Sequence, residues 1–239
     1  MTNIILGFVI IHVICDFYCQ TEKTAAKKRA YFKWVVYHAV VYGITALLFF
    51  IIFLPGLEVK YAAAFILSHG LIDMLKYFCG YWVKNDKVVF CVDQCLHFLT
   101  IAAIVYYIRN LDIDSLIRIE LQAFLEVFGI SLGMSAAWTA KLLLLHKPVN
   151  ILIAYILEGY KPPKEESTDK KAGRYIGTLE RMLIAVFIYL NQYSAIGLVL
   201  TAKSIARYDR IANEPDFAEY YLLGTLLSTI SAVCIAVIV

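Results

Sequence analysis

The stretch YFKWVVYHAVVYGITALLFFIIFL, residues 31–54, decides the class of fold. Lys33, close to its start, is its only Lys, Arg, Asp or Glu residue. A helix needs about 20 predominantly apolar residues to cross the hydrocarbon core of a bilayer. The stretch meets this requirement, so we expect residues 31–54 to form a transmembrane helix.

The whole chain has the composition of a membrane protein. Of its 239 residues, 61% are hydrophobic and 17% are charged. Soluble domains contain roughly 45–50% apolar and about 25% charged residues. We therefore predict an all-α protein, a polytopic transmembrane helical bundle of about eight spans plus one interfacial helix. The predicted spans are residues 3–20, 31–54, 61–78, 90–109, 116–145, 175–190, 193–207 and 218–239.

The segment 175–207 allows two interpretations. It could be one long helix, but the tripeptide Asn191-Gln192-Tyr193 in its middle is typical of a tight turn. We favour two helices joined by a hairpin at this tripeptide.

Residues 148–160 are apolar but too short to cross a bilayer, which favours a helix lying in the interface. The polar segment that follows them, up to residue 174, is the clearest solvated loop. The predicted organisation has three regions. These are a five-span region carrying His and Asp residues (1–147), an interfacial helix with a cytoplasmic loop (148–174), and a three-span region (175–239).

Basic residues concentrate in every second loop between the predicted spans. The loop after the first span is the clearest example, with Lys27, Lys28 and Arg29. Cytoplasmic loops of membrane proteins carry an excess of Lys and Arg. We therefore place these loops in the cytoplasm and both termini outside. The net charge of +3 is modest and its basic residues lie in loops, which does not indicate a nucleic-acid partner.

Histidine and aspartate form the most informative pattern. Four of the five histidines lie in the first four spans, and three of them have an aspartate four residues away. The pairs are His12–Asp16, His69–Asp73 and Asp93–His97, and His38 stands alone on the second span. Residues four apart share a helix face. With the predicted orientation, the three aspartates fall at one depth and the four histidines about one turn deeper.

Such a layer indicates a metal site. Ionisable groups inside a membrane are costly and face partners in the bundle interior. A divalent cation would neutralise the carboxylates, and His with Asp suits zinc first, with manganese or iron as alternatives. Packing alone is the weaker interpretation. The candidate ligands are His12, Asp16, His38, His69, Asp73, Asp93 and His97. They exceed what one tetrahedral ion needs, so either two metals bind or some aspartates orient the imidazoles.

Two glutamines lie on or near the same helix faces. Gln20 and Gln94 could hydrogen-bond a water molecule or a substrate at the metal site.

A second polar group lies in the last three spans. Glu180 and Arg181 fall in the sixth span, and Lys203 and Arg207 in the seventh. One interpretation is a structural ion pair of Glu180 with Lys203 or Arg207. The other is an anion-binding pocket in which Arg181, Lys203 and Arg207 receive a phosphate or a carboxylate.

These motifs resemble those of the DUF3307 family of bacterial integral membrane proteins. The likeness covers nearly the whole chain and rests most specifically on HVICDF (12–17) and DQCLH (93–97). SHGLID (68–73) and the C-terminal segments LER (179–181) and AKSI (202–205) extend it. The resemblance implies location in the bacterial cytoplasmic (inner) membrane, and it implies no activity, because the family's function is unknown.

Two functional classes fit the sequence best. In the first, the protein is a metal-dependent hydrolase of a phosphate-containing lipid or another anionic substrate. Asp16 or Asp93 would serve as general base. The substrate would be bound by Gln20, Gln94, Arg181, Lys203 and Arg207.

In the second class, the protein is a transporter or channel for divalent metal ions or protons. A transporter needs polar groups along the whole membrane depth, whereas these lie in the cytoplasmic half, and no internal repeat is evident. A third hypothesis is a structural membrane subunit with a stabilising metal.

Overall fold

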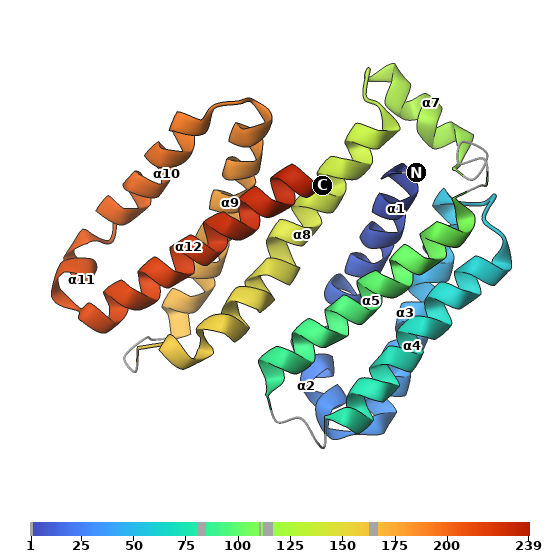
Figure 1. Ribbon diagram of the computed structural model, residues 1–239, viewed down its shortest axis with the longest axis horizontal. Helices are drawn as coiled ribbons and strands as arrows, with labels where there is room; N and C mark the ends of the chain where they lie inside the picture. Colours follow the sequence, from blue (N-terminus) through green and yellow to red (C-terminus); the bar gives the residue numbers. More distant parts are fainter. Residues whose placement is uncertain (1, 81–84, 110, 112–116, 163–166) are drawn as a thin grey trace. The chain divides into compact units, whose positions relative to one another are not determined.

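The computed structural model describes residues 2–80, 85–109, 111, 117–162 and 167–239. These residues form helices joined by short turns, without a β-strand among them (Figure 1). The prediction of an all-α protein is therefore confirmed.

The chain divides into two compact units, residues 1–140 and 141–239. The first unit contains α1 (Thr2–Val13), the π-helix η1 (Ile14–Tyr18), α2 (Glu22–Ala30), α3 (Phe32–Phe53), α4 (Val59–Cys79), α5 (Asp86–Ile108), α7 (Ile119–Val127) and the start of α8 (Leu132–Leu157). The second contains the rest of α8, the 3₁₀ helix η2 (Glu158–Tyr160), α9 (Ser167–Tyr189), α10 (Tyr193–Ile205), α11 (Tyr208–Asn213) and α12 (Pro215–Ile238).

Five helices are long and apolar enough to cross a membrane. These are Phe32–Phe53, Val59–Cys79, Asp86–Ile108, Leu132–Tyr160 and Pro215–Ile238. A sixth span is possible if the bent pair Ile4–Tyr18 and Glu22–Ala30, with an angle of 81° between its halves, counts as one. The prediction of about eight spans is therefore not confirmed.

The outer face of α3 shows why these helices suit lipid. Val40, Ile44, Leu47 and Ile51 follow one another at helical spacing and are all exposed. On a soluble helix this face would be polar, because exposed apolar surface costs free energy in water. Lipid tails remove that cost, so the exposed stripe agrees with a helix in a bilayer.

The segment 116–145 is not the single span that we expected. Helix α7 ends at Val127, and Gly129 adopts a positive φ of 66°. The amides of Gly129 and Ile130 donate to the carbonyls of Glu126 and Leu125, a Schellman pattern that ends a helix. Ser131 then accepts a hydrogen bond from the Met134 amide at the start of α8.

The prediction of an interfacial helix at 148–160 is wrong. These residues continue α8, which runs from Leu132 through Pro148 to Leu157. Proline removes one backbone donor, and apolar membrane helices tolerate this when neighbouring groups compensate. Of the solvated loop that we placed before residue 174, residues 163–166 lie outside the described residues, and α9 already begins at Ser167. Parts of the loops used for the orientation, 81–84 and 112–116, lie outside them as well.

The hairpin within 175–207 is confirmed. Helix α9 ends at Tyr189 and α10 begins at Tyr193. Asn191 takes a positive φ of 56°, and the Gln192 amide donates to the Phe187 carbonyl at 2.7 Å. Asparagine tolerates the left-handed region better than most residues, which explains the turn at this position.

The core of the first unit is aromatic and aliphatic. Helices α1, α3, α4 and α5 pack together, as Figure 1 shows. Phe8, Phe50 and Phe65 contact one another with ring centroids 5.3–5.5 Å apart. Close packing of this kind fixes the helix rotations, so polar side chains such as His12 and His69, one turn after Phe8 and Phe65, are also held in place.

Candidate metal centre

Seven polar side chains from five helical segments meet in the first unit, and we name them the His/Asp cluster. They are His12 (α1), Asp16 (η1), His38 (α3), His69 and Asp73 (α4), and Asp93 and His97 (α5). All seven are at least nine-tenths buried. The structure therefore brings together every residue that the sequence pattern selected as a possible metal ligand.

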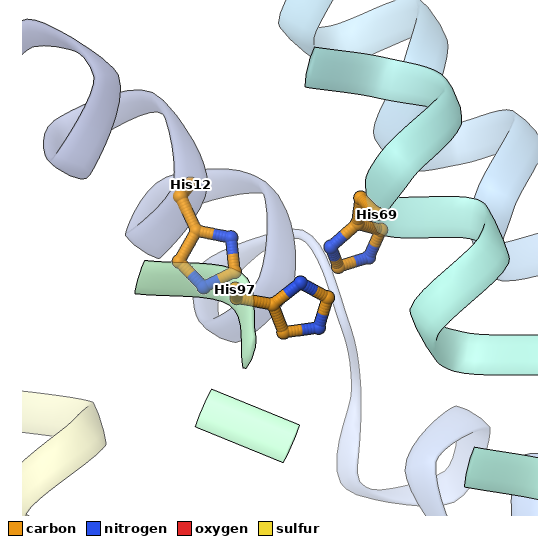
Figure 2. Close-up of side chains that lie close together, drawn as sticks. All are labelled: His12, His69 and His97. Atoms are coloured by element: carbon orange, nitrogen blue, oxygen red, sulfur yellow. The ribbon is translucent and has the colours of Figure 1, made fainter. Parts of the chain in front are cut away.

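Ligand atoms converge in three overlapping groups. One consists of His12, His69 and His97, whose rings point toward one another in Figure 2. The others are Asp16/His38/His69 and Asp73/Asp93/His97. Within each group the ligand atoms lie within 4.8 Å of one another.

Two of the three predicted His–Asp pairs contact within their own helix. His69 Nε2 lies 3.6 Å from Asp73 Oδ2, and His97 Nε2 lies 3.5 Å from Asp93 Oδ1. Both pairs are four residues apart on regular α-helix, where such side chains share a face.

Asp16 has different partners from those that its spacing predicts. Its Oδ1 lies 3.1 Å from His38 Nε2 and 3.9 Å from His69 Nε2. The reason is local, because Asp16 belongs to the π-helix η1, whose wider turn changes the direction of side chains relative to His12. His38, which had no partner in the sequence pattern, thereby acquires one.

The sequence analysis missed two lysines of the site. Lys28 of α2 donates to both carboxylate oxygens of Asp73, at 3.1 and 2.8 Å. Lys76 of α4 donates to Asp93 Oδ2 at 2.7 Å. Lys76 was detectable, since it follows Asp73 by three residues on the same helix face. Lys28 lies in a basic loop, which indicated the orientation of the chain in the membrane but not a contact with Asp73.

Tyr42 of α3 is a further missed residue. Its hydroxyl lies 3.3 Å from His12 Nδ1, and its ring stacks on His69 with 3.5 Å between centroids and 4° between planes. Tyr42 is fully buried. It follows His38 by four residues, so the helical period places it toward the cluster, but a tyrosine among seventeen carries little signal.

The two predicted glutamines differ in position. Gln94 Nε2 donates to Asp16 Oδ2 at 3.3 Å and to Asp93 Oδ2 at 3.2 Å, so Gln94 bridges two carboxylates of the cluster. Gln20 follows η1 and is half-buried, and its Oε1 is buried without a hydrogen-bond partner in the described part of the chain.

Several buried polar atoms of the cluster make no hydrogen bond to a described residue. Among the described residues, His12 Nε2, His69 Nδ1, His97 Nε2 and Asp93 Oδ1 are buried without a hydrogen bond. A buried polar atom without a partner costs about 1–3 kcal/mol. Two of the four atoms, His97 Nε2 and Asp93 Oδ1, face each other at 3.5 Å, and the cluster could hold a metal ion among these atoms. Imidazole nitrogens with a carboxylate oxygen are a donor set that suits zinc.

Arg181 of α9 occupies a different environment, in the second unit. Its Nε donates to the Leu145 carbonyl at 2.8 Å, and Nη1 donates to Ser228 Oγ at 3.1 Å. Nη2 donates to Asn150 Oδ1 at 2.7 Å and to Thr178 Oγ1 at 3.2 Å. The guanidinium is thus bonded on every nitrogen to neutral acceptors of its own unit.

Lys203 and Arg207 complete the group predicted in the C-terminal half. Lys203 Nζ lies 2.6 Å from Glu180 Oε2 and 5.4 Å from the centroid of the Tyr221 ring. Arg207 is half-buried at the turn before α11. Arg181 and Lys203 therefore have separate partners, and the described contacts bring none of the three cations together on a shared anion site.

Comparison with known families matches residues 4–125 to the family described as "Protein of unknown function (DUF3307)". The match covers just over half of the chain and includes the whole His/Asp cluster. No curated protein and no solved structure matches the chain.

Proposed function

The chain belongs to the DUF3307 family, whose function is unknown, and we propose that it is a membrane protein with a divalent metal centre that hydrolyses a phosphate-containing lipid or another anionic substrate. One observation carries the proposal. The buried His12 Nε2, His97 Nε2 and Asp93 Oδ1 make no hydrogen bond to a described residue, each belongs to a possible metal-binding group, and the last two face each other at 3.5 Å.

The three imidazoles are the proposed principal ligands. Catalytic zinc sites use three protein ligands and keep a further position open. His12, His69 and His97 supply three ligand atoms within 4.8 Å of one another. Zinc fits this set best, with manganese or iron as alternatives. A bound ion of this kind would polarise the substrate and activate a water molecule.

The aspartates and Gln94 have supporting roles in the proposal. Asp16 accepts hydrogen bonds from Gln94 and lies beside His38, so it is positioned to orient an imidazole or to take up a proton. Asp93 has one oxygen on Lys76 and the other without a hydrogen bond among the described residues, which makes it the second candidate for general base.

An anionic substrate is proposed because of the helix beside the cluster. Helix α2 carries Lys23 and Lys27 beside Lys28 and Arg29, of which Lys28 holds Asp73 and Arg29 pairs with Asp86, so Lys23 and Lys27 are the cations proposed to meet the substrate. Basic segments at a membrane surface attract anionic head groups. The pattern of basic loops also supports a bacterial inner-membrane protein whose cluster faces the cytoplasm and whose termini lie outside. Arg181 and Lys203 are not assigned to the substrate, since both already have partners in the second unit.

A transporter of divalent metal ions or protons is the second candidate. The Lys28–Asp73 and Lys76–Asp93 pairs favour it, because a carboxylate that holds one cation can exchange it for another. The hydrolase remains the better explanation, because the seven cluster residues form one compact layer and not a row along the helices.

The test begins with elemental analysis of detergent-purified protein. We expect about one equivalent of zinc or another transition metal in the wild type and a loss of at least tenfold in His69→Ala/His97→Ala. His146→Ala is the matched control, because the fifth histidine lies on α8 outside the cluster, and it should keep its metal. Wild-type protein that binds no metal after incubation with zinc would refute the metal centre.

The metal-loaded protein is then placed in vesicles of phosphatidic acid and a neutral lipid. Release of phosphate by the wild type, absent in His69→Ala/His97→Ala, would support hydrolysis. Zinc entering the vesicles without phosphate release would replace the hydrolase with the transporter.

A further inference from the structure

Two carboxylates of the His/Asp cluster each hold an ammonium group. Lys28 Nζ lies 2.8 Å from Asp73 Oδ2, and Lys76 Nζ lies 2.7 Å from Asp93 Oδ2. The two aspartate side chains are only 1% and 3% exposed. The Lys28 and Lys76 side chains are themselves 11% and 28% exposed, so each lysine brings its charge from a partly exposed position to a buried carboxylate.

The same two carboxylates belong to a possible metal-binding group. Ligand atoms of Asp73, Asp93 and His97 lie within 4.8 Å of one another. An ammonium ion and a metal ion compete for carboxylate oxygens, because both are cations that need the same lone pairs. The lysines therefore occupy the surroundings in which a second metal ion would bind.

Without the two lysines, the arrangement of ligand atoms would fit two metal ions. The groups Asp16/His38/His69 and Asp73/Asp93/His97 share no residue, and the third group, His12/His69/His97, takes one member from each. Two ions would use the two separate groups, whereas one ion would use the three imidazoles between them.

Charge decides between these possibilities. Imidazoles that bind a metal through nitrogen are neutral. Three aspartates and two lysines then leave one negative charge, which a single divalent ion converts to one positive charge. A second divalent ion would raise this to three positive charges within a buried site, where uncompensated charge is costly. Without the two lysines, the same two ions would leave only one positive charge.

We infer that the cluster binds a single metal ion at His12, His69 and His97, and that Lys28 and Lys76 occupy a latent second metal position at Asp73, Asp93 and His97. The inference rests on the metal centre of the proposed function, and it adds the number of ions and the residues that set it. Lys28 and Lys76 are thus built-in counter-ions, and their removal lets two ions bind, one at Asp16, His38 and His69 and the other at Asp73, Asp93 and His97.

The test measures zinc per full-length protein in detergent after equilibration with buffered zinc. Wild type is compared with Lys28→Met/Lys76→Met, which keeps the length of both stems and removes both charges. The matched control is Lys23→Met/Lys60→Met, which removes an exposed lysine of α2 and the exposed partner of Glu58. We expect about one zinc ion in the wild type and the control, and about two in Lys28→Met/Lys76→Met.

A second variant separates charge from side-chain shape. Lys28→Arg/Lys76→Arg keeps both positive charges and should still bind about one zinc ion, even if Lys28→Met/Lys76→Met is purified in poor yield. Two zinc ions in the wild type or in the arginine variant would overturn the inference, and so would one ion in a monodisperse Lys28→Met/Lys76→Met. Each of these results is compatible with the proposed metal centre. Wild-type protein that binds no zinc would refute both the metal centre and the inference of a latent second position.

Discussion

The His/Asp cluster of the first unit and the surroundings of Arg181 in the second unit both bury charged groups among apolar helices. They differ in how far hydrogen bonding is satisfied. Arg181 uses all three of its nitrogens on acceptors that include Leu145, Asn150 and Ser228. The cluster leaves imidazole nitrogens of His12 and His97 without a hydrogen bond among the described residues.

This difference is the one expected between a structural network and a candidate binding site. Inside a membrane no water satisfies a polar group, so a network that serves architecture must be complete in itself. Converging polar atoms without a hydrogen bond are tolerated when a ligand completes their interactions. Glu180 Oε1 in the second unit is also unpartnered within the described chain, but no group of three possible ligands surrounds it there.

The largest expected effect on stability comes from Arg181→Met. The substitution leaves the acceptors on α8, α9 and α12 without their donor, and each buried unsatisfied group costs about 1–3 kcal/mol. We expect a loss of roughly 3 kcal/mol and a fall in the thermal midpoint of roughly 6–12 °C, measured by a thermal melt in detergent. Metal content per folded protein should not change.

Arg210→Met is the control for this measurement. Arg210 pairs with Glu214 at 3.3 Å on the surface, and exposed pairs contribute about 0–1 kcal/mol. Loss of metal in Arg181→Met with an unchanged melting temperature would contradict the comparison, because Arg181 would then serve metal binding and not stability.

The convergence of the seven His and Asp residues was predictable from the sequence. Regular α-helix makes four-residue spacing a reliable guide, and the pairs of His69 with Asp73 and of Asp93 with His97 follow it. Asp16 was selected correctly but assigned to His12, since a π-helix leaves no reliable mark in a single sequence. Lys28 was missed because its partner Asp73 lies 45 residues away, and such contacts depend on tertiary packing.

The number of spans was less predictable. Hydropathy does not distinguish a continuous apolar run from one interrupted by a turn, and the Schellman turn at Gly129 divides the expected span 116–145. Conversely, the fifth span was expected to end at residue 145, where α8 continues through Pro148 to Leu157. Both errors arise because backbone conformation at a single residue is decided by its neighbours in space as well as by its type.

Tyr42→Phe gives the second largest expected effect, on metal affinity. When His12 binds a metal through Nε2, its Nδ1–H donates to the Tyr42 hydroxyl 3.3 Å away, which holds the required tautomer. Loss of such a partner reduces metal affinity roughly 10–100-fold, or about 1.4–2.7 kcal/mol. A competition titration with a zinc chelator measures this change.

Phenylalanine keeps the stacking of this ring on His69, so the thermal midpoint of the metal-free protein should stay nearly constant. Tyr37→Phe, at an exposed position of α3, serves as the control and should bind zinc as the wild type does. Unchanged zinc affinity in Tyr42→Phe would show that His12 is not a ligand through Nε2, and would narrow the centre to His69, His97 and the aspartates.

The smallest expected effect concerns the Glu180–Lys203 pair of the second unit. Glu180 is almost fully buried, whereas the Lys203 side chain is about one-fifth exposed. Lys203→Met leaves a buried carboxylate without its counter-ion and should cost about 1–2 kcal/mol, less than a fully buried pair because water reaches the lysine.

Glu180→Gln/Lys203→Met removes the isolated charge and should recover most of this loss, since the penalty lies in the unpaired carboxylate and not in the missing bond. Thermal melts of the wild type, the single variant and the double variant measure both steps. A double variant that is less stable than Lys203→Met would mean that Glu180 has a further partner, and the second unit would then contain a polar site of its own, not only a structural network.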